Sequence, residues 1–198
     1  MAISRREANK IKCRQNILKA SRRLFNSKGY EETMIDDIAE MAEISKATFY
    51  NYFPNKESLL QGTAEHELEL IRKFMDSELE DVESSDEKLR RVIEFLVLDA
   101  MPYINLSRRL TYLNCIKDSP MYAVRVGISD IFKQLIAEGM KQGCYKEGYT
   151  IDEIEDAYMS VYLVTQFEWL NIESYSEEKI KRKLHRMFDI ATAAFLNV

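Results

Sequence analysis

The sequence TMIDDIAEMAEISKATFYNYFPNK, residues 33–56, decides the fold of this chain, because it predicts two short helices joined by a tight turn. Four apolar residues recur at helical spacing in its first half: Ile35, Ile38, Ala39 and Ala42. They give the first helix one apolar face. Thr33 followed by Asp36 has the spacing of a capping box, so we expect this helix to begin at Thr33.

The second half of the stretch predicts a short helix with a polar outer side. Ser45 is a suitable N-cap, the helix should run from Lys46 to about Phe53, and Pro54 should stop it. Phe49 is four residues before Phe53, so both rings share one face. The other sides offer cations, amides and hydroxyls, which are the groups that contact phosphates and base edges.

The residues of this region that match a known pattern, in order and without a gap, are Thr33, Asp37–Ala39, Ala42, Ile44–Lys46, Thr48 and Tyr50–Leu59. The pattern resembles the helix-turn-helix of TetR-type transcriptional regulators, and the resemblance covers residues 10–60. Glu43 departs from it, because the family usually has glycine at this turn. A positive φ at a non-glycine residue costs about 1 kcal/mol, so either Glu43 accepts that strain or the turn differs.

The resemblance implies an all-α fold of about nine helices, with a three-helix DNA-binding domain in residues 1–54 and an effector-binding and dimerisation domain in residues 55–198. Only 6 Gly and 3 Pro among 198 residues agree with a nearly all-helical chain. We expect residues 1–9 to be a mobile arm. Further helices are predicted over residues 10–28, 56–81, 104–117, 152–172 and 177–196. Another should follow a turn and cap at residues 83–86 and be interrupted by Pro102, and one more should begin at Pro120 after a Ser119 cap and be closed by Gly143.

Charge is divided unevenly along the chain. Residues 1–30 contain nine Lys or Arg and a single acid, Glu7, for a net charge of +8, while the remainder carries −13. A basic end on an acidic body favours contact with a polyanion at that end. A solvated charged tail explains the charge alone equally well, and the neighbouring helix-turn-helix pattern favours nucleic acid.

The resemblance implies nine DNA-contacting residues: Thr33, Ser45, Lys46, Ala47, Thr48, Tyr50, Asn51, Tyr52 and Lys56. Lysines and tyrosines in this set should meet phosphates, as should Thr33 and Ser45 at the helix starts, while Ala47, Thr48 and Asn51 face the groove. Asn51 is the best base-reading candidate, since its amide can pair with adenine through two hydrogen bonds. Lys56→Ala is expected to weaken binding to all sequences alike, and Asn51→Ala to erode discrimination.

The body should carry the regulatory part of the function. The resemblance implies an effector pocket, for which eight aromatic residues are candidates: Phe74, Phe95, Tyr103, Tyr112, Phe132, Tyr158, Tyr162 and Phe167. An ordinary helical core explains each of them as well. The resemblance further implies a homodimer through the last two helices, a palindromic operator of double-stranded DNA, and a repressor released by a small-molecule effector. The alternative is a DNA-binding or adaptor protein of the same fold without an effector.

Other classes of function find little support in the sequence. No nucleophile stands at a recognisable spacing from a base, and no Gly-rich phosphate loop or metal-ligand cluster is present, so we expect no cofactor and no enzyme, although carboxylate-only sites stay open. Cys13, Cys115 and Cys144 are far apart and in no metal spacing, which favours reduced thiols in the cytoplasm. No signal peptide and no membrane-length apolar run is recognised.

Overall fold

The computed structural model describes residues 4–167 and 176–197, and their backbone forms helices without a strand. The elements are α1 (Arg5–Ser27), α2 (Ile35–Met41), α3 (Lys46–Tyr50), α4 (Lys56–Glu78), α5 (Ser85–Ala100), the 3-10 turn η1 (Met101–Tyr103), α6 (Ile104–Asn114), α7 (Tyr122–Lys141), α8 (Ile151–Phe167) and α9 (Glu177–Thr192). This arrangement confirms the all-α prediction and its estimate of about nine helices.

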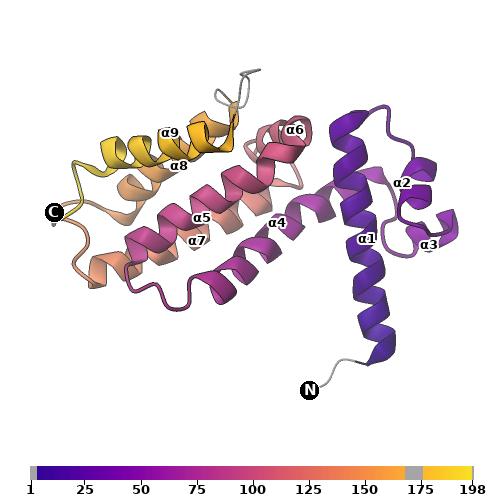
Figure 1. Cartoon of the computed structure of the whole chain (residues 1–198), viewed down its shortest axis with the longest axis horizontal. Helices are drawn as coiled ribbons and strands as arrows, with labels where there is room; N and C mark the ends of the chain where they lie inside the picture. Colours follow the sequence, from indigo (N-terminus) through magenta and orange to yellow (C-terminus); the bar gives the residue numbers. More distant parts are fainter. Residues whose placement is uncertain (1–3, 168–175, 198) are drawn as a thin grey trace.

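The first three helices form a head at one end of the molecule, and α4 leads from it into the body (Figure 1). The core of the head is built from side chains that the helical pattern places inward, such as Ile17 and Phe25 of α1 and Phe49 of α3, each at most 1% exposed. Burying side chains of this size contributes about 1.5–3 kcal/mol each. These side chains hold the head together and belong to a core that continues into the body.

The body consists of α4–α9 packed around a second group of buried side chains. Helices α5 and α7 lie at its centre, and α8 and α9 run side by side along its upper edge in Figure 1. Val97 of α5, Phe132 of α7, Tyr158 of α8 and Phe188 of α9 are all 0% exposed. The predicted apolar stripes of these helices therefore meet inside the body.

Several local signals in the sequence are confirmed at the helix ends. Gly29 follows α1 with φ of +85°, and the ring of Tyr30 folds back to 5.1 Å from that of Phe25. Asn55 caps α4 by accepting from the Ser58 N–H at 2.7 Å, and Gly143 follows α7 with φ of +74°. These ends depend on contacts within one turn of the chain, which is why the sequence reveals them.

The prediction of a mobile arm was wrong for residues 4–9. Helix α1 begins at Arg5, because Ser4 and Glu7 form a reciprocal capping box that extends the helix by more than a turn. Residues 1–3 of the expected arm lie outside the described residues. Further along, α7 begins at Tyr122 rather than Pro120, because the Met121 N–H donates to Ser119 Oγ at 3.2 Å within the preceding turn.

The last two helices are shorter than predicted where the structure describes them. Residues 168–172, the expected end of the helix from residue 152, lie outside the described residues. Helix α9 ends at Thr192 instead of Leu196. The cause is a non-local contact: the Lys146 N–H donates to Phe195 O at 2.7 Å, and the Asn197 N–H to Cys144 O at 2.8 Å. The chain end is thereby tied to the loop after α7.

Candidate nucleic-acid interface and the groove in the body

The turn between α2 and α3 is formed without glycine. Glu43 has a φ of 56°, so it accepts the left-handed conformation that the sequence left in question. Its N–H donates to Glu40 O at 3.0 Å, and the Ile44 N–H donates to Ala39 O at 2.9 Å. These bonds close the end of α2 and offset a strain of about 1 kcal/mol.

The start of α2 differs from the prediction. Met34 is the N-cap, and its N–H donates to Asp37 Oδ2 at 3.1 Å, a bond that lowers the pKa of Asp37 with help from Lys28. The Thr33 hydroxyl donates to Gly29 O at 2.7 Å, and the residue is 0% exposed. Thr33 therefore closes the end of α1 instead of capping α2, and its hydroxyl is buried away from any phosphate.

Helix α3 is capped as predicted but is shorter than the predicted helix. The Thr48 N–H donates to Ser45 Oγ at 3.0 Å, and Phe49 fills the head core at 0% exposure. The helix ends at Tyr50 instead of Phe53, because the Asn51 N–H turns to Thr48 O at 3.2 Å. A final tight turn of this kind is common at helix ends.

One exposed face gathers most of the predicted base-reading residues. Ala47, Tyr50 and Asn51 are all exposed, and Tyr50 has 45% of its surface open. Thr48 is partly buried, and its hydroxyl is 2.8 Å from Ser45 Oγ. The Tyr50 ring packs edge-on against Phe49, with 5.6 Å between the ring centroids, and the rest of its surface is open to contact with another molecule.

The two predicted phosphate-binding lysines are placed very differently. The exposed Lys46 ammonium is 2.8 Å from Asp36, which raises the pKa of Lys46. Surface pairs of this type contribute little and open readily. Lys56, in contrast, donates to the carbonyls of Tyr30, Glu31 and Thr33 at 2.8, 3.1 and 3.2 Å.

The prediction for Lys56 is therefore corrected. An ammonium has three N–H donors, and the three carbonyls use all of them. The ammonium also lies 4.5 Å from the centre of the Tyr30 ring. Lys56 holds the loop after α1 against the start of α4. The sequence carried no signal for this, since the carbonyls are more than twenty residues away.

Tyr52 is partly buried. Its hydroxyl hydrogen-bonds with Cys13 of α1, and this contact raises the pKa of Tyr52. The predicted role of Tyr52 at a phosphate is not supported by this orientation. The contact does place the chain just after α3 beside the first half of α1.

The head is fastened to the body by contacts between α1 and the α5–α6 corner. Arg22 donates to Asp99 Oδ2 at 2.5 Å and lies 4.3 Å from the Tyr103 ring centre. Asn26 donates to Pro102 O at 3.1 Å. Nearby, Arg109 donates to Glu31 at 3.0 Å. These contacts connect the corner to α1 and to the loop that follows it.

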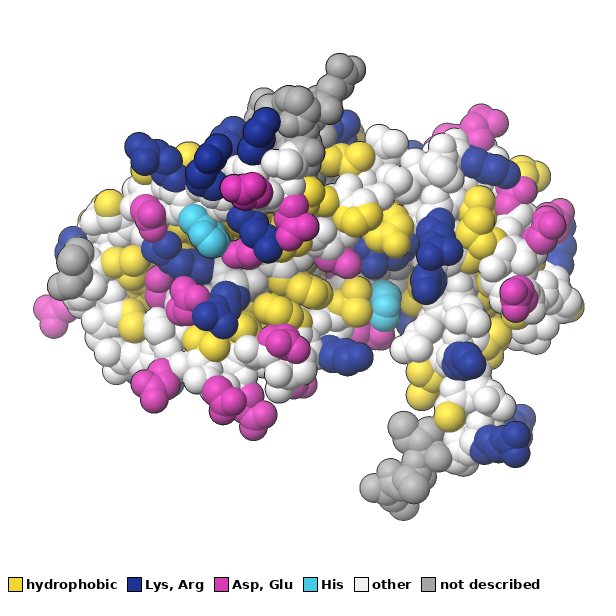
Figure 2. All heavy atoms as spheres, in the orientation of Figure 1, with side chains coloured by type: hydrophobic (Ala, Val, Ile, Leu, Met, Phe, Trp, Pro, Cys, Tyr) yellow, Lys and Arg dark blue, Asp and Glu magenta, His cyan; other side chains and the backbone are white. Residues whose placement is uncertain are grey.

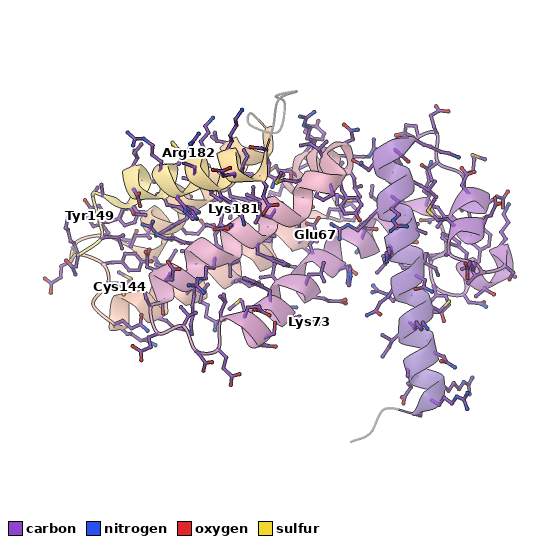
Figure 3. The ribbon with its side chains drawn as sticks, viewed as in Figure 1. Glu67, Lys73, Cys144, Tyr149, Lys181 and Arg182 are labelled. Carbon is purple, nitrogen blue, oxygen red and sulfur yellow. The ribbon has the colours of Figure 1, made fainter. Side chains whose placement is uncertain are left out.

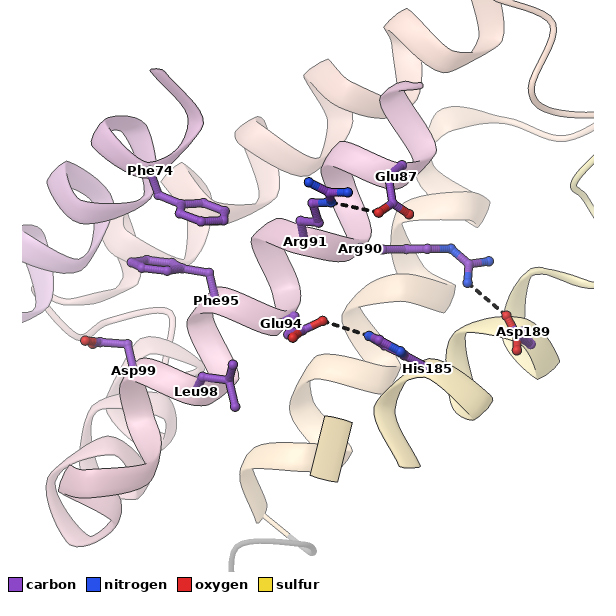
Figure 4. A pocket seen from close by; sticks show the side chains of 10 residues that line it. All are labelled: Phe74, Glu87, Arg90, Arg91, Glu94, Phe95, Leu98, Asp99, His185 and Asp189. Carbon is purple, nitrogen blue, oxygen red and sulfur yellow. Dashed lines mark hydrogen bonds and ion pairs between the residues drawn. The ribbon is translucent and has the colours of Figure 1, made fainter. Parts of the chain in front are cut away.

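A groove of about 790 Å³ lies on the body between α4, α5 and α9 (Figure 4). Its lining is Phe74, Glu87, Arg90, Arg91, Glu94, Phe95, Leu98, Asp99, His185 and Asp189. The rings of Phe74 and Phe95 are stacked at one end, 4.5 Å apart. Arg90 pairs with Asp189 at 2.9 Å. Asp99, which holds Arg22 of the head, is thus also a wall of the groove.

A smaller enclosed space adjoins the groove. It has a volume of about 10 Å³, room for about one water, and shares Phe95 and Asp99 with the groove. Glu67 of α4 and Tyr162 of α8 also line it. Burial raises the pKa of Glu67 to about 7, with Arg22 opposing and Asp99 reinforcing the shift. Glu67, labelled in Figure 3, lies near the junction of head and body.

The eight aromatic residues expected to form a pocket do not meet in one cavity of the described structure. Phe74 and Phe95 line the groove, and Phe95 and Tyr162 line the small space. Phe132 and Tyr158 are 0% exposed core residues, Tyr112 is 61% exposed, and Tyr103 lies against Arg22. The side chain of Phe167 lies outside the described residues. Helical spacing cannot separate core residues from lining residues, which is why the prediction mixed them.

The outer faces of the last two helices are more polar than expected. The apolar stripe of α9 faces this chain's own core, where Leu184 and Phe188 are 0% exposed. Its outer face carries cations, including the exposed Arg186 and the exposed Arg182, which is labelled in Figure 3. Figure 2 shows blue side chains along this edge of the body. Two apolar side chains remain outside: Val164 of α8, 43% exposed, and Ile190 of α9, 59% exposed.

The described residues contain neither a membrane-spanning helix nor a metal-binding cluster. Among the described residues, no helix combines the length and apolar character that crossing a membrane requires. Within the same residues, no group of three or more His, Cys, Asp or Glu side chains is arranged to hold a metal ion.

Known proteins share the sequence of the head and the fold of the chain. Residues 17–63 match the family model "Bacterial regulatory proteins, tetR family". Over 79 residues the chain is 34% identical to the HTH-type transcriptional regulator EthR of Mycolicibacterium smegmatis, covering 39% of this chain and 36% of that protein. Over 139 residues it is 24% identical to the fatty acid metabolism regulator protein of Bacillus subtilis, covering 68% and 72%. The chain thus spans about a third of the length of the EthR relative.

A solved structure extends the likeness to the body. The transcriptional regulator FadR from Bacillus subtilis, crystallised in complex with stearoyl-CoA, superposes with a TM-score of 0.72 at 19% identity. The superposition covers 87% of this chain and 96% of that one. At this identity the likeness shows that the body has the same fold.

Proposed function

Because the chain belongs to the TetR family of bacterial regulatory proteins, we propose that it is a sequence-specific DNA-binding transcriptional regulator. In this proposal it is a repressor that a small-molecule effector releases from a palindromic operator. The observation that carries the proposal is the exposed face of α3, where Ala47, Tyr50 and Asn51 lie together on a capped helix. A short helix with such a face fits the major groove.

Individual roles follow from the geometry of the head. Asn51 reads a base with its free amide, and the exposed Tyr50 hydroxyl and the Lys46 ammonium bind phosphates. Lys46 exchanges Asp36 for a phosphate on binding, since its surface pair is weak. Lys56 and Thr33 support the site by holding the loop after α1 in place.

The groove beside α5 is proposed as the effector site. Its stacked Phe74–Phe95 pair offers an aromatic surface, and its wall residue Asp99 is the partner of Arg22 in α1. An effector that draws Asp99 away from Arg22 loosens the head from the body. Effector and DNA then compete through differential affinity for the two states of this contact.

A homodimer through α8 and α9 is part of the proposal. Exposed Val164 and Ile190 supply apolar contacts on these helices, and pairing places two heads on one duplex. One α3 offers too few contacts for tight specific binding, whereas two half-sites double them.

The proposal is tested by selecting bound sequences from a pool of random duplexes with the full chain. A palindromic sequence is the expected result, and enrichment of no sequence contradicts the proposed function. The selected duplex then serves to screen effectors. Acyl-CoA thioesters, as bound by the FadR neighbour, and hydrophobic amines, which the acidic groove walls favour, are compared at saturation.

A second candidate is a DNA-binding protein of this fold without an effector. It is favoured by the filled interior, where Phe132 and Tyr158 are fully buried and the enclosed space next to Glu67 has a volume of about 10 Å³. Substitution of Phe95 by Ala distinguishes the two. If an effector regulates the protein, a ligand changes the operator affinity of the wild type, and Phe95→Ala loses that change. If there is no effector, no ligand changes the operator affinity of either protein.

A further inference from the structure

The first eight residues of α1 project from the head as a bare helix tip, Arg5–Lys12. Every one of them is exposed, and the buried residues of α1 begin only at Ile17. Figure 1 shows this end of α1 extending well past α2 and α3. The fold engages the helix from Arg14 onward, whose guanidinium lies 5.7 Å from the Phe53 ring centre and 3.8 Å from Glu69.

The tip continues the face of α1 that packs against the head. Lys10 lies seven residues before Ile17 and fourteen before Leu24, so the three share one side of the helix. Arg6 is one turn further out. This side is buried against the head in the second half of α1 and becomes cationic in the first half. Cys13, which follows the tip, contacts Tyr52 just after α3, so the tip emerges beside the recognition helix.

The tip carries four cations that have no ion pair among the described residues: Arg5, Arg6, Lys10 and Lys12. Its one acid, Glu7, accepts from the Ser4 N–H at 3.0 Å and the Ser4 hydroxyl at 2.7 Å in the capping box. Cations at a helix start oppose the helix dipole, and Arg6 and Lys10 repel each other one turn apart. Helix stability therefore does not account for these residues, whereas an external polyanion does.

We propose that the tip of α1 is a second DNA contact, which binds backbone phosphates outside the half-site that α3 reads. This inference rests on the proposed DNA-binding function and adds a site to it. Eight helical residues reach about 12 Å, which corresponds to three or four base pairs. In Figure 1 the tip lies at the lower edge and α8 and α9 at the upper edge, so in the proposed dimer the tips point away from the partner and toward the operator flanks.

Phosphate contacts have a measurable signature. Each neutralised phosphate releases counterions and adds about 0.9 to the slope of log affinity against log salt. If each tip contacts one or two phosphates, a dimer gains about two to four contacts. The gain appears only on duplexes that extend beyond the palindrome.

The test combines protein variants with duplex length. The tip variant carries Arg5, Arg6, Lys10 and Lys12 changed to Gln. A control variant loses the same charge from exposed body residues: Arg72, Lys73, Lys117 and Lys141 changed to Gln. Each protein is titrated, from about 0.05 to 0.3 M salt, against the selected palindrome without flanks and with about six flanking base pairs on each side.

The wild-type protein and the control variant are expected to bind the flanked duplex at least tenfold more tightly than the bare palindrome. The tip variant is expected to lose that gain, with a salt slope smaller by about 2–4. An unchanged slope and an unchanged flank effect in the tip variant overturn the inference, while the proposed function stands. If the wild-type protein binds no duplex, the proposed function itself fails.

Folding is checked separately. The four cations interact unfavourably with the helix dipole at the start of α1. The tip variant should therefore unfold at the same temperature as the wild type or at a slightly higher one. Hydrogen exchange gives an independent reading in the unmodified protein. Amides of residues 9–12 should become protected when the flanked operator binds, and equal exchange with and without it contradicts the contact.

Discussion

The tip of α1 and the acid-lined helices of the body contain cations with different partners. In the body, Arg90, Arg91 and Lys133 each lie within 3 Å of an acid on the same or a neighbouring helix. In the tip of the head, Arg5–Lys12, four cations have no such partner among the described residues. A cation that folding has already paired is held in place, whereas an unpaired one is available to phosphate. The four unpaired cations of the tip, more than the net charge of −5, therefore support the DNA contact proposed there.

Glu67 is the opposite case, an acid at the head–body junction without a cation of its own to pair with among the described residues. Arg22, which opposes the rise in its pKa, is held by Asp99. The folded pKa of Glu67, about 7, lies above the unfolded value near 4.5. The folded state thus keeps a proton that the unfolded chain has released. Stability should fall as pH rises from about 4.5 to about 7, by up to about 3 kcal/mol. Glu67→Gln should remove this loss in urea unfolding curves measured across that range.

A pH slope that persists unchanged in Glu67→Gln would contradict the burial of this carboxyl. Glu65→Gln, at an exposed position two residues away on the same helix, is the matched control and should keep the slope of the wild type.

Within the head, Lys56 and Lys46 should differ in their contributions to stability. Lys56→Met removes three hydrogen bonds that a charged ammonium donates, and it leaves three carbonyl groups without this donor. The substitution should therefore lower the free energy of unfolding by about 2–3 kcal/mol. Lys46→Met should change stability by less than about 0.5 kcal/mol, since its pair is exposed. Chemical denaturation of both variants measures this difference. Equal stability losses would show that Lys56 is not a structural clamp.

Asn51→Ala tests base reading at the exposed end of α3. Loss of a bidentate amide contact should weaken binding to the selected palindrome by about 1–3 kcal/mol per half-site and leave random duplex unaffected. Fluorescence anisotropy on the two duplexes measures both affinities. A parallel loss on both would assign Asn51 to the phosphate backbone instead.

Glu43→Gly is the smallest expected change and serves as a check on the turn. Glycine relieves a positive φ that costs Glu43 about 1 kcal/mol, but it also gains freedom in the unfolded chain. We expect a net stabilisation below about 1 kcal/mol, visible as a small rise in Tm. A clear loss of stability would mean that the Glu43 side chain contributes to the turn.

Residues whose partners are near in sequence were predictable. Ser45 capping α3, Gly29 ending α1 and Phe49 entering the core all depend on patterns within a few positions. Lys56 and Thr33 were misassigned, because each had a plausible local or surface role and a different partner in the folded head. For Thr33, the alternative cap at Met34 with Asp37 prevailed.

The candidate site in the body could not be predicted from the sequence in the same way. The groove depends on how α4, α5 and α9 are brought together, and helical periodicity does not carry that information. Phe74 and Phe95 meet there, while Phe132 and Tyr158, with the same apolar spacing, fill the core. The Arg22–Asp99 contact spans 77 positions and leaves no trace in the local pattern.

The proposal that paired heads each read one half-site is tested most directly by measuring how many chains bind an operator with one half-site destroyed. The full chain is titrated against the selected palindrome and against a duplex in which one half-site is scrambled. Two chains should bind cooperatively to the intact palindrome, and binding to the scrambled duplex should be at least a hundredfold weaker. One chain per duplex, or equal affinity for both duplexes, would contradict this proposal.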